Sequence, residues 1–344
     1  MNKSMAQHDI EKNPSAAGQT LLPAVFRLLL GIAVLTVIAG AFVSTYGAGL
    51  AIPDWPTSFG KIVLLYSPIG GIPFLPTAPW EVFLAQAHRF LGLFAFVLAV
   101  VGLILCWFTR PTWSVRMAAV AAVLAIGFQL IVGAFRIWSG TPWSAKLLAC
   151  LAPLVFLVVL LSTEWVTLAS RRQATLSRGT NRSARTLWIA PFLAGWVYFQ
   201  VVAGTQLRHA GPTESPYWFL FWVWVHVLSG LGLAIGTILA AWFVNVGWPG
   251  DPPRAGTASL RILLAGVLVP CQVVLGGATW LSRFGVPRWF TDYVASWHLT
   301  LESKAPLEIL ASTSHVVLGI VILALCGSAL AWSIWGDVGE VKTE

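Results

Sequence analysis

Charged side chains are scarce in this chain. Lys, Arg, Asp and Glu make up 10% of its 344 residues, whereas hydrophobic residues make up 57%. Because soluble domains carry about 25% charged residues, the composition excludes a soluble globular protein and indicates an integral membrane protein. The net charge of +8 does not indicate nucleic-acid binding, because most arginines fall in a few short loops between apolar segments.

Cysteine is equally sparse, and its spacing excludes several kinds of site. The four cysteines lie inside apolar runs and form no paired motif; they are Cys106, Cys150, Cys271 and Cys326. The sequence therefore predicts small core residues rather than a disulfide or a metal cluster. Residues 1–20 lack a central apolar stretch and are not rich in arginine, which argues against a cleavable signal peptide and a transit peptide.

What the chain has in abundance is long apolar windows. Windows of about 20 residues, enough to cross a bilayer, occur eight times, at 22–44, 80–108, 114–137, 143–168, 187–207, 217–244, 260–282 and 306–335. The loop between the fourth and fifth carries Arg171, Arg172, Arg178, Arg182 and Arg185. Arginine-rich loops stay in the cytoplasm, so both termini are expected there, and the expected location is a bacterial cytoplasmic membrane.

The chain also repeats once along its length. Gln129-x-x-x-Gly133 in the third window corresponds to Gln272-x-x-x-Gly276 in the seventh, and His88 in the second corresponds to His226 in the sixth. Chance recurrence would not explain why the order of the motifs repeats. The expected fold is all-α, with two pseudo-symmetric four-helix bundles of the same orientation. The expected parts are a cytoplasmic tail (1–21), a first unit (22–168), an Arg-rich linker (169–186), a second unit (187–335) and a second tail (336–344).

Three histidines stand at one depth in these windows. His88, His226 and His315 each follow the start of an apolar segment by eight or nine residues, which places them roughly 12–14 Å below one membrane surface. An imidazole in hydrocarbon costs free energy unless something binds it. Axial ligation of haem iron is one interpretation, and a hydrogen bond to a neighbouring helix is the other.

Several of these segments, taken in order, resemble the haem A synthase family of cytochrome oxidase assembly proteins. The stretch from Gly40 to Pro56, GAFVSTYGAGLAIPDWP, looks like the first extracytoplasmic signature of that family. His88-Arg89, the two Gln-x-x-x-Gly motifs and His315-Val-Val-Leu-Gly319 are similar to the motifs that follow in the family.

The resemblance implies an oxidoreductase that converts haem O to haem A by oxidising a porphyrin methyl group to a formyl group. His226 and His315 would be the axial ligands of a resident b-type haem in the C-terminal unit, and His88 would face the iron of the substrate haem. The implied partners are haem O and its synthase, an electron donor, the cytochrome oxidase assembly machinery and membrane lipid. Nucleic acid is not among them, and homo-oligomerisation is left open.

The chain departs from the family pattern at three places. Ala85 stands where the family has a catalytic glutamate, and Glu81, two turns before His88, is the nearest carboxylate. Leu148 aligns with His315 where the family has a further histidine, with Lys146 as the nearest polar residue. In the third place, Ile52 and Ser58 replace a cysteine pair of the first outer loop.

The remaining polar residues leave alternatives open. Arg89 lies deep enough to need an anionic partner, either a haem propionate or Asp54. Arg208, followed by His209, is either a propionate clamp or an ordinary interfacial cation. Gln129 and Gln272 are expected to tie helices together. The loop 289–306 suggests an amphipathic interfacial segment; its His298 and the N-terminal His8 receive no function.

Three functions compete on these observations. The first is the haem A synthase-type oxidoreductase, with Glu81 and His88 as catalytic candidates. The second is a non-catalytic membrane b-type cytochrome or oxidase-assembly factor that has lost the N-terminal hydroxylase site, which Ala85 and Leu148 favour. The third is a transporter with an internal repeat. The absence of interrupted apolar segments with paired charges argues against the transporter.

Overall fold

The computed structural model describes residues 16–63, 79–174, 184–211, 213–246, 256–286 and 304–335. Several sequence expectations lie wholly or mostly outside these ranges: the two tails, most of the Arg-rich loop and the interfacial segment expected at 289–306, together with His8 and His298.

The described chain consists almost entirely of long helices. They are α1 (Ala16–Thr45), α2 (Trp80–Thr109), α3 (Trp113–Ser139), α4 (Pro142–Ala174), α5 (Ala184–Arg208), α6 (Pro216–Asn245), α7 (Thr257–Phe284) and α9 (Pro306–Trp335). Each is long and apolar enough to cross a membrane, so the eight expected spans are confirmed. The largest differences are at the start of α1 and the end of α4. α4 continues through Arg171 and Arg172, because arginine is a good helix former and the apolar pattern does not mark its polar last turns.

Large apolar side chains cover the outside of the bundle. Trp107 is 83% exposed, Trp188 82% and Val274 71%, as a lipid-facing surface requires, while the backbone groups are paired within the helices. The expectation that all four cysteines are core residues is partly wrong. Cys106 and Cys326 are buried, but Cys271 is exposed, because an apolar window does not reveal which face of a helix turns to lipid.

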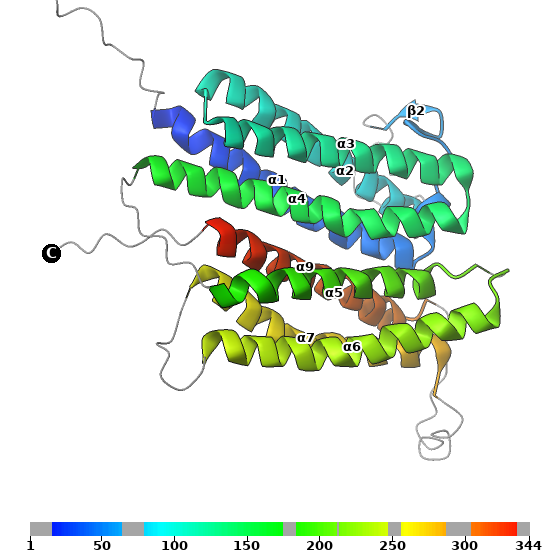
Figure 1. Ribbon diagram of the computed structural model, residues 1–344. Helices are drawn as coiled ribbons and strands as arrows, with labels where there is room; N and C mark the ends of the chain where they lie inside the picture. The colour runs from blue at the N-terminus through cyan, green and yellow to red at the C-terminus, as the bar shows by residue number, and fades with distance from the viewer. Residues whose placement is uncertain are drawn as a thin grey trace, which may run out of the picture.

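The helices form two groups that lie against each other. In Figure 1, α1 to α4 form one group and α5, α6, α7 and α9 form the other. Within the second group α9 packs on α5 and α7, and it also contacts α1 and α4 of the first group. α9 is accordingly the most buried span: 56% of its most apolar stretch is buried, against 22–28% in the others. The helix that carries His315 is therefore central to the molecule.

The three histidines lie toward one end of the bundle, which we call the histidine end. The α1–α2 loop and the α5–α6 loop lie at this end, whereas α1 begins and α9 finishes at the opposite end (Figure 1). The α1–α2 loop contains a short 3-10 helix, η1 (Ala48–Leu50), and a hairpin of β1 (Thr57–Ser58) and β2 (Lys61–Ile62). This hairpin was not expected from the sequence.

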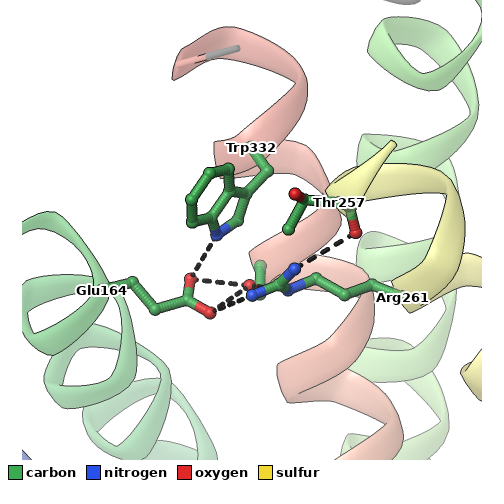
Figure 2. A network of polar contacts seen from close by, with 5 residues as sticks. Glu164, Thr257, Arg261 and Trp332 are labelled. Atoms are coloured by element: carbon green, nitrogen blue, oxygen red, sulfur yellow. Dashed lines mark hydrogen bonds and ion pairs between the residues drawn. The ribbon is translucent and has the colours of Figure 1, made fainter. Parts of the chain in front are cut away.

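At the opposite end, a polar network joins the two helix groups (Figure 2). Glu164 of α4 accepts hydrogen bonds from Arg261 of α7 at 2.6 Å and from Ser328 and Trp332 of α9 at 2.7 and 3.2 Å. Arg261 also donates to Ser328 and to the carbonyl oxygen of Thr257. Among the described residues, the donors to this carboxylate of the first group thus all come from the second.

Candidate functional site

Each of the three imidazoles approaches a glycine of a neighbouring helix with its Cε1 atom. The pairs are His88 on Gly40, His226 on Gly204, and His315 on Gly276. A Cβ atom added to these glycines would stand 2.9, 3.1 and 3.0 Å from the Cε1 atom of the histidine. Each helix therefore needs glycine at this point for the ring to approach, and the approach is the same in all three places.

The same neighbouring helix also engages one ring nitrogen. Nδ1 of His88 lies 3.1 Å from the carbonyl oxygen of Thr36, and Nδ1 of His315 lies 3.1 Å from that of Gln272. A carbonyl oxygen only accepts, so Nδ1 carries the proton and donates it. Nε2 then keeps its lone pair, which is the tautomer of a metal-ligating histidine with its other nitrogen held by a carbonyl.

His226 lies against Gln200 of α5 in a related way. The backbone of Gln200 interacts with the imidazole, and the side-chain amide nitrogen of the same residue donates to the carbonyl oxygen of His226 at 3.2 Å and to Nδ1 at 2.9 Å. Gln200 precedes Gly204 by four residues, as Thr36 precedes Gly40 and Gln272 precedes Gly276. In each case, one helical turn provides both the backbone carbonyl group and the glycine that the imidazole contacts.

His226 and His315 face each other across the second helix group. Their ring centres are 6.2 Å apart and their planes are inclined by 81°. Two metal–imidazole bonds of about 2 Å each, together with the radii of two imidazole rings, add up to roughly 6 Å between ring centres. The separation therefore suits one metal ion held between the two rings. No group of three or more His, Cys, Asp or Glu side chains that could hold a bare metal ion occurs in the described part of the chain.

The first helix group has only half of this arrangement. Gln272 donates from its side chain to the carbonyl oxygen of His315 at 2.9 Å, and Gln129 donates in the same way to that of Leu148 at 3.3 Å. The structure therefore places Leu148 where the second group has His315, as the sequence alignment of the two halves predicts. The expectation that both glutamines tie helices together is confirmed.

Glu81 lies at the surface in the first turn of α2. Its carboxylate forms an ion pair with Lys304, Nζ to Oε1 at 2.9 Å, and both side chains are more than a third exposed. Lys304 lies two residues before the start of α9, so this pair links the two helix groups at the histidine end. The carboxylate that sequence reasoning placed nearest to His88 is thus engaged with a cation of the other group.

Arg89 is buried and forms hydrogen bonds with the α1–α2 loop. Its guanidinium donates to the carbonyl oxygens of Ile52 and Thr57 at 2.9 and 3.0 Å and to the hydroxyl of Ser58 at 3.1 Å. Asp54 instead accepts hydrogen bonds within the loop. Burial acts to raise its pKa, but the bonds from the Thr57 hydroxyl and from two backbone amides leave that pKa below its usual value. Among the described residues, the hydrogen bonds of Arg89 thus go to neutral oxygens of the loop, and Asp54 acts on its guanidinium through its charge.

Arg208 joins the two helix groups near the same end. It donates to the hydroxyls of Ser44 and Thr45 at 2.8 and 2.6 Å and to the carbonyl oxygen of Ala41 at 3.0 Å. Thr45 in turn contacts Thr313, two residues before His315, at 3.2 Å. The cation expected to be a clamp or an interfacial residue therefore binds the end of α1.

Positive charge gathers around His209, which follows α5. Its burial and the nearby charges of Arg208, Arg136, Arg283 and Lys146 lower the pKa of His209 to about 4. Lys146 is paired with Glu214 at 3.0 Å. With His209 neutral at pH 7 and the charge of Lys146 offset by Glu214, the charges of Arg208, Arg136 and Arg283 leave this end positive, which favours carboxylate ligands there.

Sequence reasoning missed two kinds of residue at the site. The glycines under the imidazoles were noted only as parts of motifs, although their recurrence opposite each histidine was a usable signal. Gln86, 1% exposed, was missed altogether. It accepts from Ser58 and donates to the carbonyl oxygen of Val63; its place three residues before Arg89 puts both side chains on one helix face toward the loop.

Comparison with known families gives one match. A family model described as COX15-CtaA, cytochrome oxidase assembly protein, matches residues 3–161. No curated protein matches the chain. Within these residues, the family match confirms the resemblance that the motifs indicate. It covers the half of the chain that contains His88 and Leu148.

Proposed function

Since residues 3–161 belong to the COX15-CtaA family of cytochrome oxidase assembly proteins, we propose that this multi-pass membrane protein acts in that assembly as a haem A synthase-type oxidoreductase. It would convert haem O to haem A by oxidising a porphyrin methyl group to a formyl group. The observation that carries the proposal is the pair His226 and His315, 6.2 Å apart, in a chain of this family.

The paired histidines would hold a b-type haem in the C-terminal unit. Haem supplies its own four equatorial nitrogens, so the protein needs to provide only the two axial ones. Gln272 orients His315 through Nδ1, and Gln200 engages His226. A site with two axial imidazoles has no open position, so it suits electron transfer. In this role the C-terminal unit passes electrons from a donor toward the N-terminal unit.

The N-terminal unit would receive haem O beside His88. With dioxygen as oxidant, the conversion of one methyl to one formyl group consumes two dioxygen molecules, four electrons and four protons, and releases three water molecules. Within this reaction His88 presents Nε2 to the substrate, because Thr36 holds Nδ1. The lipid-embedded helices exclude bulk water, which strengthens every electrostatic contact with the reacting edge.

The positive charge at the histidine end also supports bound haem. The cations around His209 provide charge for propionate carboxylates. Arg208 and Arg136 would contribute to this charge; Arg89 would act by fixing the loop over the substrate.

The conversion can be tested in cells that make haem O but have no other source of haem A. Pigment extraction should give haem A when the wild-type chain is expressed and none with His88→Ala. His226→Ala and His315→Ala should each remove the low-spin b-type spectrum as well. Cys271→Ala, at an exposed position on α7, is the matched control and should behave as wild type. Wild-type protein that inserts, meets haem O and yields no haem A would contradict the proposal.

A second candidate is a b-type cytochrome or assembly factor that has lost the hydroxylase chemistry. The replacement of the second N-terminal ligand by Leu148 favours it, as does the engagement of Glu81 with Lys304. This candidate predicts haem B alone in the extracted pigment, an unchanged His226–His315 spectrum, and a chain that supports oxidase assembly when haem A comes from another source.

The proposed setting is a bacterial cytoplasmic membrane, with both termini in the cytoplasm and the histidine end facing outward. The proposed partners are the haem O synthase that delivers the substrate, an electron donor and other components of oxidase assembly. In this orientation the network around Glu164 lies toward the cytoplasm.

A further inference from the structure

We propose that the N-terminal unit binds the iron of its haem through His88 alone and leaves the second axial position open to a small neutral diatomic ligand, such as dioxygen or carbon monoxide. This inference rests on the proposed function only in that a haem binds beside His88. It adds a ligand-binding property that the paired site in the C-terminal unit lacks.

The internal repeat of the structure identifies the open position. In the C-terminal unit, the side chain of Gln272 donates to the carbonyl oxygen of His315, and His315 supplies an axial imidazole. In the N-terminal unit, the side chain of Gln129 makes the same bond to Leu148. The two helix pairs therefore share one register. The residue whose carbonyl oxygen accepts this bond is His315 in the C-terminal unit and Leu148 in the N-terminal unit. Leucine has no atom that can coordinate iron.

The space next to the glycine on the facing helix also differs between the two units. A Cβ atom added to Gly276 would meet Cε1 of His315 at 3.0 Å, whereas one added to Gly133 would meet no atom within 4 Å. Leu148 therefore does not fill the volume against α3 that the imidazole fills against α7. The space that the His315 imidazole occupies next to Gly276 is therefore present next to Gly133 but contains no side chain of the described residues.

The polar groups next to Leu148 on α4 are engaged or directed elsewhere. Lys146 is paired with Glu214 at 3.0 Å, and Cys150, two residues after Leu148, lies on a different face of α4. The amide nitrogen of Gln129 donates a hydrogen bond to the carbonyl oxygen of Leu148. None of these three groups is placed to supply a second axial ligand in place of Leu148.

The coordination difference has a direct consequence. A haem with one axial imidazole is five-coordinate and accepts a diatomic ligand, while a haem held by two imidazoles is six-coordinate and does not. One chain would thus contain an electron-transfer haem and a ligand-binding haem, in equivalent positions of its two units. The apolar Leu148 side chain favours a neutral ligand over an anion, because an uncompensated charge in such surroundings is expensive.

Carbon monoxide is the probe for this property. Full-length protein would be purified in detergent, loaded with haem B, reduced, and titrated with carbon monoxide while the Soret band is recorded. We expect wild type to bind carbon monoxide at the N-terminal haem while the paired haem stays unchanged. Leu148→His should convert the N-terminal haem to a low-spin form and weaken carbon monoxide binding at least about tenfold, since the imidazole must first be displaced. Cys271→Ala, at an exposed position of α7 in the other helix group, is the control and should bind as wild type.

The outcomes separate this inference from the proposed function. Reduced wild type that carries haem at both sites and binds no carbon monoxide would overturn the inference, even if the same protein makes haem A. Carbon monoxide binding that Leu148→His leaves unchanged would also overturn it. Binding that is lost in Leu148→His and in His88→Ala supports the inference, whether or not haem A is formed. If Leu148→His fails to fold, the wild-type titration and His88→Ala still decide.

Discussion

At the scale of single residues, the glycines beneath the imidazoles control how each histidine is presented. Gly40, Gly204 and Gly276 each contact a ring closely enough that one added methyl group must displace it. The carbonyl one turn earlier then fixes the ring rotation. Haem affinity should therefore depend on these glycines as well as on the histidines, although glycine itself coordinates nothing.

The first prediction compares two adjacent glycines of α7. Gly276→Val should push the His315 ring away from its position. An overpacked contact costs about 1–3 kcal/mol, which corresponds to roughly a tenfold or larger loss of affinity for the paired haem. Gly277→Ala is the matched control, because its Cβ would meet no atom within 4 Å. Haem retention after gel filtration measures the difference, and equal retention in both variants would show that the ring contact is unimportant.

The second prediction asks what Glu81 does. If its carboxylate stabilises positive charge that develops on the oxidised methyl carbon, Glu81→Ala should lower haem A output without changing the paired haem at His226 and His315. Lys304→Ala removes only the partner in the 2.9 Å ion pair and should preserve output. Equal losses in the two variants would assign Glu81 a structural role between the helix groups. Normal output from Glu81→Ala would reject it as the catalytic carboxylate.

At the scale of helices, α4, α7 and α9 meet in the network around Glu164 (Figure 2). The pair of Glu164 and Arg261 is mostly shielded, with side chains 15% and 19% exposed. Removal of one partner leaves the other charge poorly compensated, whereas removal of both does not. The network should therefore hold the two helix groups together at the end away from the histidines.

The third prediction is a double-mutant cycle on this pair. Glu164→Gln and Arg261→Met should each lower the thermal stability of detergent-purified protein, and the double variant should lose less than the sum. A coupling of about 1–2 kcal/mol is expected for contacting residues in one network. The haem spectrum should stay unchanged, because the network lies at the far end of the bundle. Strictly additive losses would show that the two charges do not interact.

At the scale of the whole molecule, the repeat explains why much of the architecture was predictable. Apolar windows fixed the eight helices, since a bilayer imposes one length on all of them, and the motif order predicted the match of Leu148 to His315. The partners of Arg89 and Arg208 could not be predicted. An isolated sequence shows that a buried cation needs acceptors, but carbonyl oxygens of a distant loop or helix carry no sequence signal.

Sequence patterns also could not predict which cysteines face outward or which residue pairs with Glu81. Cys271 and Cys326 occupy similar apolar sequences, yet one faces outward and the other lies in the core, because helix rotation is set by packing among all eight spans. Glu81 shares a helix face with His88, but its ion pair with Lys304 joins residues more than two hundred positions apart, and no local pattern predicts such a contact.

The last prediction concerns the orientation of the whole bundle. Five arginines between positions 171 and 185, from the end of α4 to the start of α5, are its strongest cytoplasmic determinant. In a Cys271→Ala background, a cysteine introduced by Lys61→Cys, at an exposed position of β2, should react with an impermeant maleimide in intact cells. A cysteine introduced by Ser177→Cys should react only after the membrane is opened. This pattern places the three histidines in the outer half of the membrane, at the end that carries the cations around His209. The reverse pattern would turn the bundle over and place both proposed haem sites next to the cytoplasm.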